Sequence, residues 1–140
     1  MNNPSALADK LHSLGSATQL PKGTFIFGQG DPAKGVYMID KGQASVSLAG
    51  EDGIPRWSRV VGSGAILGLP SSISGEPYTL SAVALENVDA TFVSRSAVCE
   101  LMASDVSIAA QIVSLLSDEL ADLRRKVSLL KSGVPQFAGS

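Results

Sequence analysis

Short alternations of apolar and polar residues run through the middle of the chain. Between residues 43 and 49 the alternation is strict, with Ala44, Val46 and Leu48 on one face and glutamine or serine between them. This period of two predicts a strand that is buried on one side. Turn residues separate it from similar runs, and together these predict a closed β unit, a barrel or jelly roll, over residues 20–93. The other runs lie at residues 24–27, 36–39, 56–61, 80–85 and 90–93.

A helical period precedes this β-rich region. Leu7, Leu11 and Leu14 are four and three residues apart and would form one apolar stripe. Ser5 can cap such a helix, and Gly15 can end it. We therefore expect a helix over residues 6–14 that packs outside the β unit.

The C-terminal third returns to a helical period. A short helix is expected over residues 96–102, capped by Ser94 or Ser96, and a long helix over residues 105–131, capped by Ser104. In the long helix, apolar residues recur at spacings of 3, 4, 3, 4, 3, 4 and 3. These seam residues are Val106, Ala109, Val113, Leu116, Leu120, Leu123, Val127 and Leu130.

This unbroken heptad seam predicts a homodimer. Valine stands at three of four a positions, with Leu120 at the other, and leucine stands at three of four d positions, which favours a parallel two-stranded coiled coil. Glu119 and Arg124 would form an interchain pair worth about 0.3–0.5 kcal/mol. The alternative is an amphipathic helix lying on its own barrel, where a second stripe of Ile108, Ile112 and Leu115 is expected to pack. The expected dimer interface is Val113, Leu116, Glu119, Leu120, Leu123, Arg124, Val127 and Leu130.

Residues 62–82 are rich in glycine and serine and lie between two strand-like runs. Gly62, Gly64 and Gly68 let the backbone turn sharply and approach a ligand closely. Successive backbone N–H groups in such a loop can bind an anion. However, no lysine or arginine occurs between Val60 and Ser94. The sequence therefore predicts a loop with the shape of a phosphate site and without its cation.

Composition and charge narrow the function classes. With 44% hydrophobic and 17% charged residues, the 140-residue chain is expected to form one globular domain. Its net charge of −2 gives no general attraction to nucleic acid or anionic membranes. The sequence has neither a signal-peptide pattern nor a run of about 18 apolar residues, so we expect a cytoplasmic protein without membrane contact.

Few residues are suited to metal or covalent chemistry. The single histidine, His12, is expected at the surface, and the single cysteine, Cys99, as a small buried residue of the short helix. Metal sites in β-rolls need several histidines with a carboxylate, and a serine nucleophile needs a nearby base. We therefore expect no metal site, no catalytic residues and no enzymatic activity.

The segment from Gly23 to Val46 has glycines, aromatic residues and an aspartate at fixed offsets. It reads G-x-x-I-F-x-x-G-D and then Y-x-I-x-x-G-x-x-x-V, which closely resembles the opening signature of cyclic nucleotide-binding domains. The resemblance covers residues 20–130 and implies the sensor half of the catabolite-activator family of bacterial regulators. That implies a mainly β fold, a double-stranded β-helix or β-roll, with a long helix at the dimer axis. The matching residues, expected to be structural, are Gly23, Ile26, Phe27, Gly30, Asp31, Tyr37, Ile39, Gly42 and Val46.

The same resemblance identifies residues 62–82 as the phosphate-binding cassette. Its pattern is G-x-x-F-G-E, followed further on by arginine and then serine, threonine or alanine. The glutamate position, which binds the ribose hydroxyl in the family, falls on Leu69. The arginine position, which pairs with the cyclic phosphate, falls on Tyr78 or Thr79. The ligand-binding residues implied are Gly64, Leu67, Gly68, Leu69, Tyr78, Thr79, Leu80 and Ser81.

Both charged contacts with a nucleotide are therefore missing. Losing the buried arginine–phosphate pair costs about 2–4 kcal/mol. A ribose hydroxyl facing Leu69 without a partner costs about 1–3 kcal/mol. Together these losses weaken a roughly micromolar ligand to millimolar or beyond, so weak or no cyclic nucleotide binding is expected. Glu76 could act as a displaced acid, but its neighbours Gly75 and Pro77 predict an exposed loop.

Two functions remain open. The first is a non-enzymatic, homodimeric sensor module with a small-molecule effector under the cassette. The second is a ligand-free interaction or scaffold module for a protein partner, which requires Leu69 and Tyr78 to fill the pocket. Nine residues follow Lys131, too few for a helix-turn-helix domain, so this chain itself is not expected to contact nucleic acid. It would be a stand-alone module or the detached sensor half of a DNA-binding regulator.

Overall fold

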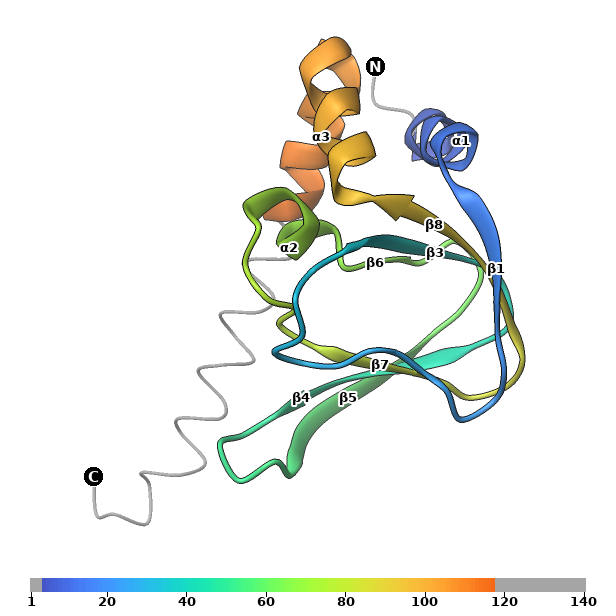
Figure 1. Cartoon of the computed structure of the whole chain (residues 1–140), viewed down its shortest axis with the longest axis vertical. Coiled ribbons are helices and arrows are strands. Elements are labelled where there is room, and N and C mark those ends of the chain that lie inside the picture. Colours follow the sequence, from blue (N-terminus) through green and yellow to red (C-terminus); the bar gives the residue numbers. More distant parts are fainter. Residues whose placement is uncertain (1–3, 118–140) are drawn as a thin grey trace.

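Two four-stranded antiparallel sheets face each other, and helices cover one end of the molecule (Figure 1). This computed structural model describes residues 4–117. The sheet orders are β1-β8-β3-β6 and β2-β7-β4-β5, which confirms the mainly β jelly-roll fold. The strands are β1 Ser16–Leu20, β2 Phe25–Phe27, β3 Gly35–Lys41, β4 Ala44–Ala49, β5 Pro55–Val61, β6 Ile66–Leu67, β7 Ser81–Ala84 and β8 Val88–Ser94. The helices are α1 Pro4–Leu14, α2 Leu69–Ser74 and α3 Arg95–Ser104, and residues 106–117 are also helical.

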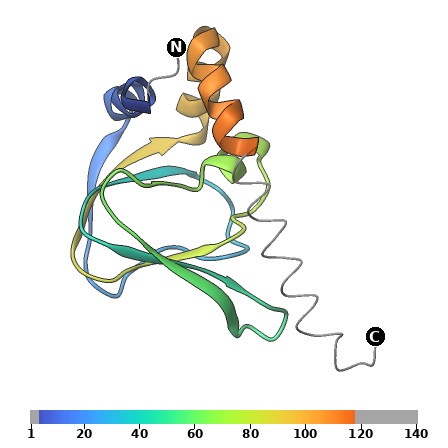
Figure 2. The same cartoon turned by 180° about the vertical axis from the view of Figure 1, so that it is seen from behind.

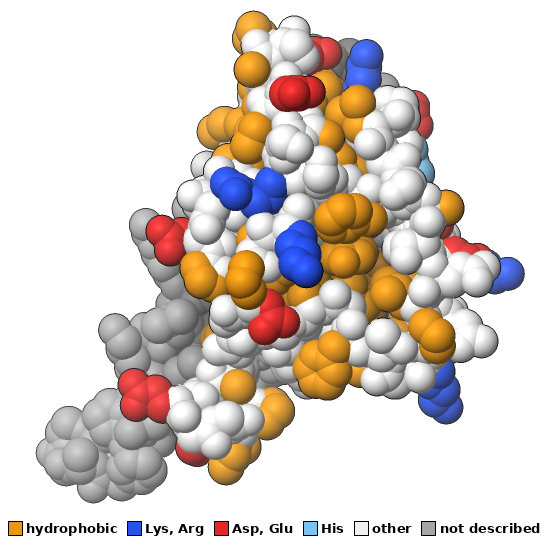
Figure 3. Space-filling model, in the orientation of Figure 1, with side chains coloured by type: hydrophobic (Ala, Val, Ile, Leu, Met, Phe, Trp, Pro, Cys, Tyr) orange, Lys and Arg blue, Asp and Glu red, His pale blue; other side chains and the backbone are white. Residues whose placement is uncertain are grey.

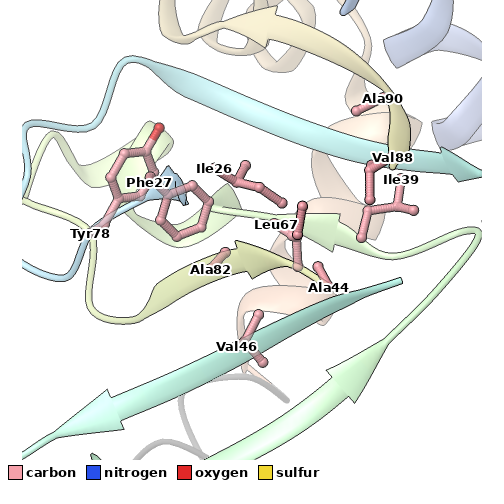
Figure 4. Packing of buried hydrophobic residues seen from close by; sticks show 11 residues of the cluster. Ile26, Phe27, Ile39, Ala44, Val46, Leu67, Tyr78, Ala82, Val88 and Ala90 are labelled. Carbon is pink, nitrogen blue, oxygen red and sulfur yellow. The ribbon is translucent and has the colours of Figure 1, made fainter. Parts of the chain in front are cut away.

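The inner faces of the two sheets form the first hydrophobic core (Figure 4). The alternation predicted for β4 is confirmed, because Ala44, Val46 and Leu48 are buried and the residues between them are only partly buried. The signature residues Ile26 and Ile39 pack in the same core. Figure 4 shows their side chains pointing between the sheets. The core members are Ile26, Phe27, Ile39, Ala44, Val46, Leu67, Tyr78, Ala82, Ala84, Val88 and Ala90.

The second core lies outside the roll, beneath the helices. Leu7 and Leu11 of α1 are buried there, so the expected position of this helix outside the β unit is confirmed. Leu14, predicted to share their stripe, is 45% exposed, because it ends the helix at the edge of this contact. The core members are Leu7, Leu11, Val36, Met38, Leu69, Val93, Val98, Leu101, Ile108 and Ile112.

The helical segment 106–117 crosses this second core and ends near α2 (Figure 2). Ile108 and Ile112 are buried as expected, whereas Leu115 is 37% exposed and Leu116 packs against the core in its place. The cap is Asp105 rather than Ser104, because the Asp105 carboxylate accepts the backbone N–H of residue 108 at 3.1 Å.

Two seam residues of this helix are left uncovered. Val106 is 85% exposed and Val113 is 54% exposed. Leu116, a third seam residue, faces inward. The remaining predicted interface residues lie outside the described residues and are Glu119, Leu120, Leu123, Arg124, Val127 and Leu130.

Three elements were not predicted, β1, β6 and α2, and the two-residue strand β6 lies within the stretch expected to be a loop. Strand β1 lies in residues assigned to a helix end and a linker, because its exposed, polar edge position leaves no apolar alternation. Helix α2 lies within the stretch expected to be a loop. Cys99 is exposed rather than buried, because α3 turns Val98 and Leu101 toward the core instead. The first helix begins at residue 4, so Ser5 lies inside it and is not its cap.

Apolar and charged side chains both reach the face of the molecule shown in Figure 3. On the face shown in Figure 3, apolar side chains reach the surface between the helical end and the second sheet, and acidic side chains are scattered. Within residues 4–117, no helix has both the length and the apolar character needed to cross a membrane.

Candidate ligand-binding site

A cavity of about 410 Å³ opens beneath the cassette stretch. Its walls come from the inner face of β5, from β6 and α2, from the segment between α2 and β7, and from Leu116 of the C-terminal helix. The lining residues are mostly apolar. They are Phe27, Val46, Trp57, Arg59, Val61, Ile66, Leu67, Gly68, Pro70, Ser71, Ile73, Ser74, Glu76, Tyr78, Thr79, Leu80 and Leu116.

Helix α2 has six residues, and a glycine at each end fixes its position. Gly68 and Gly75 both have φ of 83°, the left-handed region that favours glycine. A Cβ atom at Gly68 would lie 2.7 Å from the Tyr78 ring, so only glycine allows this approach. Pro70 lies in the first turn and has no N–H to donate. The glycines therefore fix the turn before α2, and Pro70 offers no backbone donor to an anion.

The serine hydroxyls around α2 already have backbone partners. Ser71 Oγ donates to Pro77 O at 3.0 Å, and Ser72 Oγ donates to Gly68 O at 2.7 Å. Ser81 Oγ accepts the N–H of Gln29 at 2.9 Å. These contacts hold the loop in shape. Donation from Ser71 or Ser72 to a phosphate would break an existing hydrogen bond, whereas the Ser81 hydroxyl accepts here and still has its proton to donate.

Tyr78 is a structural residue at the end of this cavity. Its side chain is 4% exposed, and its ring stacks on Phe27 with centroids 4.0 Å apart and planes at 12° (Figure 4). Its hydroxyl donates to Gly35 O at 2.7 Å and accepts the N–H groups of Lys34 and Gly35 at 3.2 Å. This buried phenol satisfies backbone groups of β3 and the turn before it.

The structure brings together five of the eight residues expected to bind ligand. Leu67, Gly68, Tyr78, Thr79 and Leu80 line the cavity. Gly64, Leu69 and Ser81 do not line it. In particular, Leu69 is 1% exposed and packs in the second core, so it does not fill the cavity. Glu76 is exposed as expected and still contributes to the lining.

Sequence reasoning did not identify the contribution of β5. Val46, Leu48 and Ala44 point inward, and the β5 residues directly opposite them in the register share that face. The residues so placed are Trp57, Arg59 and Val61. The guanidinium of Arg59 lies 5.9 Å from the Trp57 ring centroid. The period of two in both strands was the signal that could have found this set.

Helix α3 is tied directly to α2. Arg95 Nε donates to Ser72 O at 2.9 Å, and Arg95 N donates to Lys34 O at 3.0 Å. One arginine thus links the cassette helix, the turn before β3 and the first turn of α3. A movement of α2 would therefore shift Arg95 and the start of α3.

A smaller cavity of about 210 Å³ shares Phe27 and Tyr78 with the first. Tyr37 also lines it, and burial raises the pKa of the Tyr37 hydroxyl, with a lesser contribution from Tyr78. Its volume is about half that of the larger cavity, which is therefore the better candidate for a ligand site.

His12 is part of a polar cluster away from both cavities. Its Nε2 lies 2.5 Å from Asp40 Oδ1, and its Nδ1 lies 2.8 Å from Ala8 O. Both neighbours are acceptors, so the protonated imidazole can donate from both ring nitrogens. The hydrogen bond to Asp40, followed by the one to Ala8, raises the pKa of His12 above its ordinary value. The second Asp40 oxygen accepts from Thr91 Oγ1 at 2.7 Å, which anchors the carboxylate.

Comparison with known proteins gives one family and several relatives. The family described as "Cyclic nucleotide-binding domain" matches residues 17–105. The "CRP-like cAMP-activated global transcriptional regulator" of Mycobacterium tuberculosis is 26% identical over 117 residues, which are 84% of this chain and 52% of that protein. The chain therefore spans about half the length of this relative.

Solved structures share the fold. The catabolite activator protein of Thermus thermophilus has a TM-score of 0.78 and 24% identity, over 90% of this chain and 59% of that one. The c-di-GMP responsive regulator CLP of Xanthomonas campestris has a TM-score of 0.70 and 22% identity, over 91% of this chain and 64% of that one.

Proposed function

The chain belongs to the cyclic nucleotide-binding domain family, and from this premise we propose that it is a regulatory sensor module whose cavity binds cyclic nucleotides weakly or not at all. The observation that carries this proposal is the lining of the cavity. The resemblance puts the family's phosphate-binding arginine position on Tyr78 or Thr79, both of which line the cavity, and the Tyr78 hydroxyl is already bonded to backbone groups of Lys34 and Gly35. A cyclic phosphate placed there would lose water without gaining a cation from the cassette.

The open cavity favours a sensor over a ligand-free scaffold. A scaffold was expected to fill its pocket with Leu69 and Tyr78. Leu69 packs in the second core instead, and about 410 Å³ remains open beneath the cassette. This volume falls within the usual range of small-molecule sites, about 300–1,000 Å³.

We propose that ligand binding acts on the C-terminal helix. Leu116 belongs to the heptad seam and also lines the cavity, so a bound ligand would contact the proposed dimer helix directly. The exposure of Val106 and Val113 supports pairing of this seam with a second copy. In this proposal the module works without catalysis in the cytoplasm and passes its state to a protein partner or to a DNA-binding half of a longer regulator.

Isothermal calorimetry with cyclic AMP, cyclic GMP and cyclic di-GMP tests the proposal. The expected dissociation constant for each mononucleotide is about 1 mM or weaker, because the arginine–phosphate pair is absent. A micromolar constant for either mononucleotide would show that this cavity retains nucleotide chemistry, and the proposal would be wrong.

A further inference from the structure

The large cavity has a chemical character that points to a ligand class. Its wall consists mainly of aliphatic and aromatic side chains from both sheets and α2. Transfer of apolar ligand surface from water to such a wall is favourable, at about 25 cal/mol per Å². The same wall disfavours a sugar, whose hydroxyls would lose their water partners. The body of a suitable ligand is therefore apolar.

Two charged side chains contribute to this wall, Arg59 and Glu76. The register of β5 against β4 places Arg59 opposite Val46 on the inner face. Within residues 4–117, no carboxylate lies within ion-pair distance of Arg59. Its recorded contact is the Trp57 ring, 5.9 Å from the guanidinium carbon. Arg59 is exposed to solvent and also lines the cavity, so its guanidinium can donate hydrogen bonds to an anion at the cavity wall.

The charge balance limits the anion that fits. A guanidinium matches a carboxylate through two parallel hydrogen bonds. Glu76 contributes one negative charge to the same wall, so there is no excess of positive charge for a phosphate dianion. A single carboxylate at one end of an apolar molecule satisfies both observations.

We propose that the cavity beneath the cassette binds an apolar monocarboxylate, with its apolar body against the aliphatic wall and its carboxylate at Arg59. This inference rests on the proposed function, because it takes this cavity as the effector site. In this proposal the anion contacts Arg59 of β5, rather than a residue of the cassette. The competing explanation is that Arg59 protects an edge strand, since inward charges on edge strands discourage pairing with other chains.

Binding can be followed without a label, because Trp57 is the only tryptophan in the chain and lines the cavity. The probes are octanoate and its neutral counterpart 1-octanol, titrated into the full chain below their solubility limits while tryptophan fluorescence is recorded. The variants are Arg59→Gln and a matched control, Arg56→Gln. Arg56 lies on the same strand, is exposed, pairs with Asp52 and does not line the cavity.

Octanoate is expected to give a saturable change in the unsubstituted protein and in Arg56→Gln, with at least about ten-fold weaker binding in Arg59→Gln. Binding of 1-octanol is expected to be weaker than that of octanoate and equal in all three proteins. Equal octanoate binding by Arg59→Gln and the unsubstituted protein would overturn the inference in favour of edge protection. Absence of any saturable octanoate signal would also overturn it.

A cavity-filling variant checks that the signal comes from this site. Leu80 lines the cavity and is partly buried. Leu80→Phe is expected to weaken both probes together, and unchanged binding would place them elsewhere and overturn the inference. The calorimetry with cyclic nucleotides separates the two levels of the account. Micromolar cyclic AMP binding contradicts the proposed function, whereas failure of octanoate alone contradicts only the ligand class.

Discussion

Tyr78 shows why the divergence of this site is structural as well as chemical. The family resemblance makes Tyr78 one of two candidates for the arginine position, and here the tyrosine hydroxyl bonds with the backbone of Lys34 and Gly35. Burying these backbone groups without a partner costs about 1–3 kcal/mol each. The residue has therefore become part of the core that supports the cavity. The sequence predicted the loss of the arginine, and it gave no sign of this new role.

His12 carries the clearest pH dependence. Its pKa is raised in the folded protein by Asp40 and then by Ala8, so folding favours the protonated form. The resulting stabilisation is fully present below the ordinary pKa near 6.5 and is lost as the pH rises through the raised value. At pH 5.5 we expect the free energy of unfolding of the unsubstituted protein to exceed that of His12→Gln. The difference should be at most about 1 kcal/mol, because the His12–Asp40 pair is partly exposed.

Urea unfolding of both proteins between pH 5.5 and 9 measures this difference. The gap should narrow as the pH rises. Asp40→Asn, which removes the partner that raises the pKa, should flatten the pH dependence in the same range. A gap that widens with pH would mean that the neutral form of His12 is the one stabilised by folding.

At the scale of elements, α2 depends on the backbone freedom of its two flanking glycines. Gly68 and Gly75 have the same φ of 83°, yet their surroundings differ. A Cβ atom at Gly68 would approach the fixed Tyr78 ring to 2.7 Å, while one at Gly75 would approach the flexible end of Arg95 at 3.0 Å. The two positions thus separate backbone strain from crowding.

Gly75→Ala is expected to cost about 1–2 kcal/mol from the left-handed backbone alone. Gly68→Ala should cost about 1–3 kcal/mol more, because Tyr78 is held by three hydrogen bonds and cannot move aside. Urea unfolding midpoints of the two variants provide the measurement. Equal midpoints would indicate that the Tyr78 ring yields readily and that the cassette is less rigid than its contacts imply.

The elements also show what sequence reasoning can reach. Strand β4 was predictable because one face is buried and the other is only partly buried, so apolar and polar residues alternate along it. Helix α2 was missed because six residues with a proline and three serines carry no helical period. Strand β1 was missed because its residues are mostly exposed and it is recognised only by its pairing with β8.

The candidate site likewise contains residues that the sequence predicts and residues that it does not. Leu67 and Gly68 follow from the local cassette pattern. Arg59 comes from a strand outside the cassette, and its place on the cavity wall depends on the register between β4 and β5. Long-range pairing of this kind has no local signal beyond the shared period. Leu69 illustrates the reverse case, because a matching pattern position packs in a different core.

At the scale of the whole molecule, the cavity and the proposed dimer helix share Leu116. The exposed seam residues Val106 and Val113 continue into a heptad pattern that extends beyond the described residues. Burying this seam against a second copy would remove apolar surface from water on both chains. Occupancy of the cavity and the association of two chains are thus expected to be coupled.

Replacing Leu120 and Leu123 together by lysine should convert the protein from dimer to monomer, because two charges would enter each side of the seam. Light scattering should report half the mass. A matched control replaces two exposed apolar residues away from the seam, Ile54 and Leu85, by lysine and should leave the dimer intact. A dimer that survives the seam substitutions would assign association to another surface.

The central proposal is that the cavity is open while the cassette stretch, which has no lysine or arginine, supplies no cation to a cyclic phosphate. Titrating cyclic AMP into the unsubstituted protein and into Thr79→Arg, side by side in a calorimeter, tests it most directly, because Thr79 is exposed and lines the cavity. The unsubstituted protein should bind at about 1 mM or weaker, and Thr79→Arg at least about ten-fold more tightly. Micromolar binding by the unsubstituted protein, with no gain from the added arginine, would contradict the account.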